Sequence, residues 1–476
     1  MAKDINSGKD RQGSGIPYQT SRGERLSYGA YAFGQMMFFM IVGNFLQLYM
    51  TDSGIPAVLV GGIFIVAKVW DAVNDPLFGI IVDKSRLKSG KFIPWVRLSS
   101  FLIPAATILL FAIPADVSVQ IKAIWAAVAY MLWDTAYTIC DVPIFALATS
   151  MTKDIKERDW LYLLNRLFMF VGGLLVAILV PLLFPSIGWT MTVAIMSVLA
   201  MATMLPTGFK ARERHHVDSG KSASVGDLLR YLASNKPLLV FNGALIVAAL
   251  TNTATAITNY VAIYCLGGTE WISVLGLVMT LPMLVSILLA KQLIRRIDKF
   301  TIYMVCMGCN LILGVLMYFA GYGNMALFFA IIVARAFFVS TGGILVVMFT
   351  ADCAEYGHFV TGERAQGMAF SIQTFSAKLT AALAGAIGMF VLGAVGFVEG
   401  EGAVQTVGTI EWIWRMYTIL PVIAGAVSFL LLLFGYRLRD CDVALMARVN
   451  AGEITEDEAR GGFSRQYADR APNRDK

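Results

Sequence analysis

Long runs of apolar residues alternate with short polar segments along almost the whole chain. A helix needs about 20 mostly apolar residues to cross the hydrocarbon core of a bilayer. Runs of that kind lie near 27–51, 56–82, 95–114, 119–149, 162–184, 189–207, 237–266, 270–293, 301–321, 324–351, 366–396 and 412–436. The pattern predicts an all-α integral membrane protein with twelve transmembrane helices.

The loops between these predicted helices differ in charge. If the N-terminus is cytoplasmic, the loops on that side hold most of the basic residues, whereas the outer loops hold only Lys122 and Arg415 beside several acids. Cytoplasmic loops of membrane proteins carry an excess of Lys and Arg. The charge pattern therefore predicts two cytoplasmic termini, and a single miscounted helix would invert it.

A polar segment in the middle of the chain separates two sets of six helices. We expect a cytoplasmic tail at 1–26, a six-helix bundle at 27–207, a central cytoplasmic loop at 208–236, a second six-helix bundle at 237–436 and a cytoplasmic tail at 437–476. This layout is typical of the major facilitator architecture, whose two halves are related by a pseudo-two-fold axis along the membrane normal.

The composition excludes a soluble protein. Of the 476 residues, 57% are hydrophobic and only 15% are charged, whereas soluble domains carry roughly 25% charged residues. The net charge of +6 resides in the loops, so no nucleic-acid partner is expected. No cleavable signal peptide is expected before the first apolar run, which is expected to be an uncleaved targeting signal.

Charged residues inside a membrane helix are costly and need a reason. In the helix predicted at 56–82, Asp71, Asn74 and Asp75 share one face because they are spaced at i, i+3 and i+4. Their oxygens suit a hard cation such as Na⁺. Two close carboxylates can instead share a proton, because like charges raise one pKa. A purely structural ion pair with Lys68 is the alternative.

The helix predicted at 119–149 carries a second polar face. Asp134, Thr138 and Asp141 lie at i, i+4 and i+7, and Tyr137 adjoins them. Carboxylates can accept hydrogen bonds from sugar hydroxyls, and an aromatic ring offers a face to a pyranose. Bonding between helices is the alternative role for these residues. Pro143 is expected to interrupt the helix and help open it around a cavity.

Three later helices add basic side chains. Arg166 can bind a hydroxyl or carboxylate, or extend to the membrane surface. Arg335 is expected to pair with one of the intramembrane acids. Thr374 and Lys378 share a face at i and i+4, and Lys378 must pair with an acid or contact water. Together these groups predict a polar pathway through the interior of the protein.

Several motifs, in the same order along the chain, resemble the glycoside–pentoside–hexuronide:cation symporter family (melibiose permease-like) of the major facilitator superfamily. The matching stretches are Tyr28-Gly29, Phe33-Gly34, Tyr49 to Asp52, Trp70 to Pro76, Gly90 to Trp95, Tyr137-Thr138, Asp141 to Pro143, Glu355 to Gly357, Gln373-Thr374 and Lys378. The resemblance covers essentially the whole membrane region.

The resemblance implies roles for individual residues. It assigns a cation (metal) site to Asp71, Asn74, Asp75 and Thr138, with Lys378 close by. It assigns substrate contacts to Tyr137, Asp141, Phe145, Arg166, Gln373, Thr374 and Lys378. Two positions depart from the family pattern: Met36 replaces a sugar-binding carboxylate and Asp134 replaces a glycine. These departures, both on the substrate side, argue against an α-galactoside and favour another glycoside, a hexuronide or a more apolar conjugate.

The expected function is secondary active transport by alternating access. We expect symport of a sugar, glycoside or hexuronide-like solute with Na⁺ or H⁺, in a bacterial inner membrane. No cofactor other than the coupling ion is expected, and the protein is expected to act as a monomer among lipids. The alternative is an uncoupled facilitator or exchanger for a more apolar or anionic solute. An enzyme is not expected, because catalytic motifs are missing and His215, His216 and His358 fall in predicted loops.

Overall fold

The computed structural model describes residues 19–85, 90–215, 225–362 and 365–464. The first half of the chain forms six long helices. They are α1 (Arg22–Asp52), α2 (Ala57–Lys84), α3 (Ile93–Leu110), α4 (Val119–Met151), α5 (Ile155–Ile187) and α6 (Trp189–Lys210). These bounds agree with the predicted spans to within a few residues, except that α5 begins seven residues before the expected position 162.

The second half forms a matching set. A short amphipathic helix, α7 (Val225–Ser234), precedes a discontinuous span made of α8 (Lys236–Val247), α9 (Ala249–Ala256), α10 (Thr258–Tyr260) and a π-helical turn (Val261–Cys265). Long helices follow: α11 (Glu270–Ile294), α12 (Lys299–Ala320), α13 (Met325–Thr361), α14 (Gln366–Ala394) and α15 (Val407–Gly435). The chain continues in α16 (Asp440–Asn450) and α17 (Glu456–Arg460).

Among the described residues, eleven helices are long and apolar enough to cross a membrane. The helix predicted at 119–149 is not one of them by composition, although α4 has 33 residues and packs against α2 and α3. Its middle carries Asp134, Thr135, Thr138 and Asp141, which lower its apolar character. The all-α membrane fold is therefore confirmed, and the polar middle of α4 accounts for its absence from the helices that qualify by composition.

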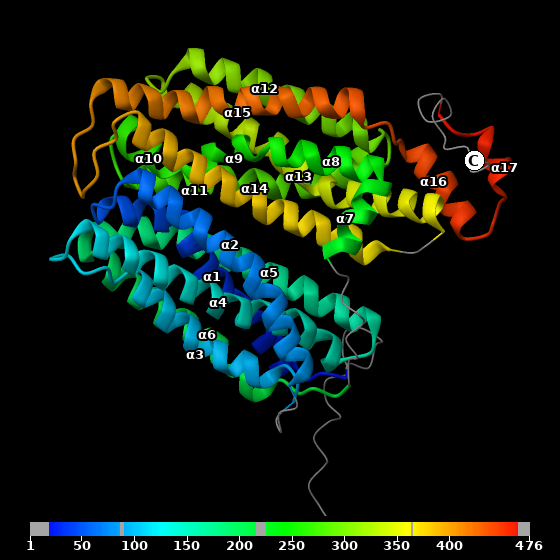
Figure 1. Ribbon diagram of the computed structural model, residues 1–476, viewed down its shortest axis with the longest axis horizontal. Helices are drawn as coiled ribbons and strands as arrows, with labels where there is room; N and C mark the ends of the chain where they lie inside the picture. Colours follow the sequence, from blue (N-terminus) through cyan, green and yellow to red (C-terminus); the bar gives the residue numbers. More distant parts are fainter. Residues whose placement is uncertain (1–18, 86–89, 216–224, 363–364, 465–476) are drawn as a thin grey trace, which may run out of the picture.

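The helices form two bundles that lie side by side (Figure 1). Small residues let helices approach closely within the first bundle. A Cβ atom at Gly34 of α1 would lie 2.6 Å from the Ala200 carbonyl oxygen of α6, and one at Gly172 of α5 would collide with the Phe33 carbonyl. This close packing holds α1 between α5 and α6.

Hydrogen bonds join the two bundles at the end that carries the α1–α2 turn. The Ala57 N–H donates to Glu399 (2.9 Å), and the Gly400 N–H donates to the Thr51 carbonyl (3.0 Å). Asn259 donates to the Asn44 carbonyl (2.6 Å). Towards the opposite end, which carries α7 and α16, the bundles diverge (Figure 1). In the part of the chain that the structure describes, the two halves are thus joined by hydrogen bonds at one end and spread apart towards the other (Figure 1).

Two local expectations were wrong. His358 lies inside α13 and not in a loop, because that helix continues to Thr361. Pro143 lies inside the continuous helix α4, which tolerates one missing backbone hydrogen bond, and so does not interrupt it. The discontinuous span is instead the one from α8 to Cys265, which contains no proline after Pro237.

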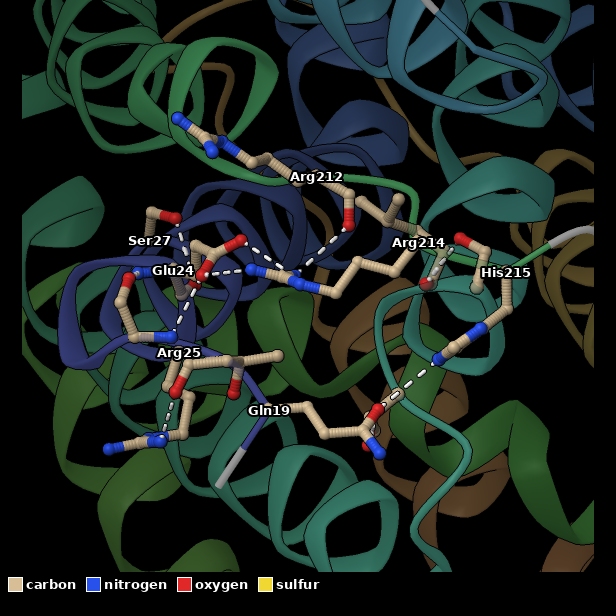
Figure 2. Close-up of polar contacts among 12 residues, drawn as sticks. Gln19, Glu24, Arg25, Ser27, Arg212, Arg214 and His215 are labelled. Atoms are coloured by element: carbon tan, nitrogen blue, oxygen red, sulfur yellow. Dashed lines mark hydrogen bonds and ion pairs between the residues drawn. The ribbon is translucent and has the colours of Figure 1, made fainter. Parts of the chain in front are cut away.

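The start of the central segment is tied to the first bundle. Figure 2 shows Arg214 beside Glu24 of α1, where its Nη2 donates a hydrogen bond of 2.9 Å, and His215 beside Gln19. The Glu213 carboxylate accepts backbone N–H groups at the N-terminus of α3, at 2.7–2.8 Å. Anions stabilise a helix N-terminus. His215 is thus a loop residue as predicted, and His216 lies outside the described residues.

Candidate functional site

The most polar part of the membrane region lies between α2 and α4. The Asn74 amide donates a hydrogen bond to the Thr138 hydroxyl (2.9 Å), and that hydroxyl is 2.9 Å from the Asp75 carboxylate and 3.1 Å from the Asp134 carbonyl. Asp71, Asn74 and Thr138 are buried. The helical spacing predicted from the sequence brings these side chains together, because residues three and four apart face the same neighbour.

Lys378 of α14 reaches across to this cluster from the other bundle. Its ammonium forms an ion pair with Asp75 and lies 3.5 Å from Asp71. Lys68 lies 3.5 Å from the same Asp71 oxygen. The side chains of Lys378 and Asp75 remain 45% and 34% exposed. The two carboxylates are therefore neutralised by ammonium groups in this conformation, at a place that small ions can reach.

Asp134 lies next to this cluster and is buried. The residue is only 5% exposed, and its Oδ2 atom has no hydrogen-bond donor among the described residues. An unsatisfied buried carboxylate oxygen is costly. Asp134 is therefore positioned to accept a proton or a hydrogen bond from a ligand.

Asp141 is held by a residue that the sequence analysis did not include in the site. The Gln35 amide of α1 donates a hydrogen bond of 2.6 Å to the Asp141 carboxylate, and Gln35 is fully buried. The Oε1 atom of Gln35 has no donor among the described residues. A polar amide in the middle of the first apolar run, beside Met36, was the available signal for Gln35.

An aromatic surface adjoins these acids. The rings of Trp133 and Tyr137 stack with centroids 5.1 Å apart, and Phe39 lies 5.7 Å from Tyr137. The Phe145 side chain, about two turns further along α4, is half-buried, and the Phe145 backbone carbonyl accepts a hydrogen bond from Tyr162 (3.4 Å). Such rings can pack against the apolar face of a sugar.

The remaining predicted substrate residues are more scattered. Arg166 is exposed and makes no ion pair or hydrogen bond with the described residues. The Thr374 hydroxyl is exposed and bonds to the Phe370 carbonyl of its own helix (3.0 Å). Met36 of α1 lies against α5, because a Cβ atom at Gly173 of α5 would be 3.7 Å from the Met36 side chain. Gln373 does not join the α2–α4 cluster and lines a cavity inside the second bundle.

Arg335 corrects one prediction. No carboxylate of the described residues lies within 4.0 Å of it, so the expected intramembrane acid is not its partner. Its Nε donates to the Asn310 side chain (3.0 Å) and its Nη1 to the Met317 sulfur (3.3 Å). Arg335 points towards α12 and the interior of the second bundle, away from the acids of α2 and α4.

The ligand types restrict what the α2–α4 cluster can bind. Among the described residues, no group of three or more His, Cys, Asp or Glu side chains is placed to hold a metal ion. The set Asp71, Asn74, Asp75 and Thr138 offers two carboxylates, an amide and a hydroxyl. Oxygen ligands of this kind suit hard cations, and the same carboxylates can take up protons.

Comparison with known proteins points to one family. Residues 27–440 match the MFS/sugar transport protein family. An isoprimeverose transporter from Lactiplantibacillus pentosus is 28% identical, over 89% of this chain and 90% of the relative. A putative glycoside/cation symporter of Escherichia coli K12 is 26% identical, over 85% and 89%.

Solved structures show the same fold. A bacterial homologue of the iron transporter ferroportin, described as inward-facing, has a TM-score of 0.63 at 14% identity, over 88% of this chain and 99% of its own. These observations confirm the resemblance inferred from the motifs. The chain belongs to the MFS/sugar transport protein family, and it is a multi-pass membrane transporter and not an enzyme.

Proposed function

We propose that the protein is a symporter that couples the movement of Na⁺ or H⁺ to that of a sugar, glycoside or hexuronide-like solute. The proposal places it in a bacterial inner membrane with both termini in the cytoplasm. The observation that carries it is the contact of Lys378 with Asp71 and Asp75, because this contact crosses from one bundle to the other.

The coupling argument starts from competition for the carboxylates. A cation that binds between Asp71 and Asp75 competes with the Lys378 ammonium for the same oxygens. Displaced from Asp75, Lys378 no longer ties α14 to α2, so cation binding alters the relative stability of the two bundle arrangements. Coupling then requires only that the solute favours the same arrangement as the cation.

The solute would bind beside the cation site, between α4 of the first bundle and α14 of the second. Asp134, Asp141 and the aromatic rings of α4 offer hydrogen-bond acceptors and an apolar face. A membrane potential contributes about 2.3 kcal/mol per charge per 100 mV to inward cation movement. In the proposed orientation, the closed end is periplasmic and the diverging end is cytoplasmic. The described arrangement would thus release solute inward.

Uptake into vesicles tests this function. The full chain is reconstituted in liposomes, and uptake of radiolabelled glycosides and uronides is measured with a Na⁺ gradient, with a pH gradient and with neither. Accumulation above the outside concentration is expected with one of the two gradients. Equal uptake with and without a gradient would identify an uncoupled facilitator, and no uptake of any sugar would overturn the proposal.

A disulfide across the closed end tests alternating access. A Cβ atom at Gly393 of α14 would lie 3.6 Å from the Cβ atom of Val58 on α2, within the usual range for disulfides. We expect the double variant Val58→Cys/Gly393→Cys to lose transport on oxidation and to recover it with a reducing agent. The bond would keep this end closed. Gel shift after protease cleavage of the central segment would verify the bond.

The two single variants and the oxidised wild type serve as controls, since the six native cysteines are free. They should transport equally with and without oxidant. Wild-type transport by the cross-linked double variant would contradict an alternating opening of this end.

A further inference from the structure

A cavity of about 490 Å³ lies inside the second bundle, apart from the α2–α4 cluster. It is lined by side chains of α9, α12, α13, α14 and α15. The polar ones include Asn252, Asn310, Arg335, Gln373, Thr380 and Tyr417. Its volume falls within the range of small-molecule sites, which is roughly 300–1,000 Å³.

Arg335 is the charged residue among the side chains that line this cavity, and no carboxylate of the described residues lies within 4.0 Å of it. By contrast, the intramembrane lysines Lys68 and Lys378 each lie within 4.0 Å of a carboxylate. Arg335 has only the neutral partners Asn310 and Met317, and its Nη2 donates no hydrogen bond to the described residues. Burying a charge without a counter-charge is expensive. A free donor nitrogen at a cavity is therefore a place for an anion.

The chemistry of guanidinium narrows the class of anion. Its planar fork matches the two oxygens of a carboxylate, and it binds other oxyanions through the same donors. Asn310 fixes the guanidinium through Nε, which leaves the terminal nitrogens for a ligand. On the other sides of the cavity, sugar hydroxyls can form hydrogen bonds with the amides of Asn252 and Gln373 and with the Tyr417 hydroxyl.

The depth of Arg335 in the membrane favours a solute over a lipid headgroup as the ligand of this cavity. Arg335 is ten residues from the start of α13 at Met325, which places it about 15 Å along the helix axis. The hydrocarbon core is about 30 Å thick. Arg335 thus lies near mid-membrane, where solutes of transporters bind and phospholipid headgroups do not reach.

Helix α14 connects the cavity to the cation cluster. Gln373, Ala377 and Thr380 face the cavity, whereas the adjacent Lys378 contacts Asp75 in the other bundle. A ligand in the cavity and a cation at Asp75 would therefore act on the same helix. We propose that the Arg335 cavity binds the anionic group of the solute, which makes the transported sugar one that carries a carboxylate or a sulfonate; this inference rests on the proposed function.

The test uses matched probes that differ at one position. Methyl β-glucuronide carries a carboxylate where methyl β-glucoside carries a hydroxymethyl group, and a 6-sulfonated methyl glucoside gives a third member. Binding to the purified full chain in phosphatidylcholine nanodiscs is measured by calorimetry, and uptake is measured in liposomes. We expect at least tenfold tighter binding of one charged probe than of the neutral probe. In Arg335→Gln this preference should fall below about twofold.

Control variants separate recognition from folding. Arg335→Lys keeps the charge and should retain part of the preference, while Arg415→Gln removes an arginine that pairs with Glu411 outside the cavity and should retain all of it. Thermal unfolding of each variant is measured in parallel. If Arg335→Gln fails to fold, Arg335→Lys is compared with the wild type instead. An unchanged preference for the charged probe in Arg335→Lys would contradict the proposed role of the planar guanidinium.

The outcomes distinguish this inference from the proposed function. Coupled accumulation of the neutral probe at least as strong as that of both charged probes would overturn the anion site and leave the symporter proposal standing. A charged preference that survives in Arg335→Gln would do the same. A preference that disappears when phosphatidylglycerol is added would assign the cavity to a lipid and overturn the inference. No accumulation of any probe would overturn both.

Discussion

Replacing Asp75 with Asn is expected to abolish cation-driven accumulation of the solute. Asp75 contacts both Thr138 and Lys378 and is the partly exposed carboxylate of the cluster. The amide keeps the shape of the side chain but removes the charge that attracts the cation. A tenfold cation gradient with a 100 mV potential supplies roughly 3.7 kcal/mol, enough for several-hundred-fold accumulation. The variant should reach no more than equal concentrations on the two sides.

Two measurements test whether the loss of accumulation in Asp75→Asn is a loss of coupling. Solute exchange between preloaded vesicles and the medium, without a gradient, should persist in Asp75→Asn because the solute groups on α4 are intact. Asp116→Asn removes an exposed loop acid and should accumulate solute like the wild type. Retained accumulation in Asp75→Asn would refute the cation assignment.

Replacing Lys378 with Met is expected to separate cation binding from transport. Its ammonium occupies the position beside Asp71 and Asp75 that the cation would take. Two like charges about 4 Å apart repel by about 4 kcal/mol at an effective dielectric constant of 20. Without this repulsion the variant should bind the coupling cation at least tenfold more tightly, as measured by cation-dependent thermal stabilisation of the purified protein.

Transport by Lys378→Met should nevertheless be slow. When the cation leaves, two carboxylates lose their neutralising partner, and an uncompensated buried charge costs several kcal/mol. Net uptake is expected to fall at least tenfold while exchange continues. Lys122→Met, which removes a lysine that donates to the Ser53 carbonyl in the α1–α2 turn and makes no contact with the acids of α2, is the matched control. Cation affinity that is unchanged or weaker in Lys378→Met would contradict the competition.

The helical spacing of the polar residues in α2 correctly predicted that they share one face. Asp71, Asn74 and Asp75 were expected on one face of a helix, and Asn74 and Asp75 both contact Thr138 in the structure. The expectation for Lys378, an acid or water, also holds, since it pairs with Asp75 and stays exposed. These successes share a cause: helical periodicity fixes which side chains share a face before any tertiary contact forms.

Partners across helices were harder to predict. The role of Gln35 at Asp141 was missed, and Arg335 was wrongly expected to pair with an acid. In both cases the outcome depends on which face of another helix is turned towards the residue. The hydropathy pattern did not show that α13 continues past the membrane to Thr361. The last turns of this helix pack on α16 and on Tyr231, and such tertiary contacts cannot be recognised from hydropathy.

The sequence by itself determined the fold class, the two sets of helices and the acidic faces of α2 and α4. These features follow from the length of apolar runs, the distribution of basic residues and the helical repeat, all of which are local. Only the tertiary structure decided that Lys378 meets Asp75 across the two bundles and that the halves meet at one end. It also decided that Arg335 lines a cavity and has no ion pair with a carboxylate of the described residues. Each of these depends on how whole helices pack against one another, and such packing joins residues hundreds of positions apart, which no local pattern records.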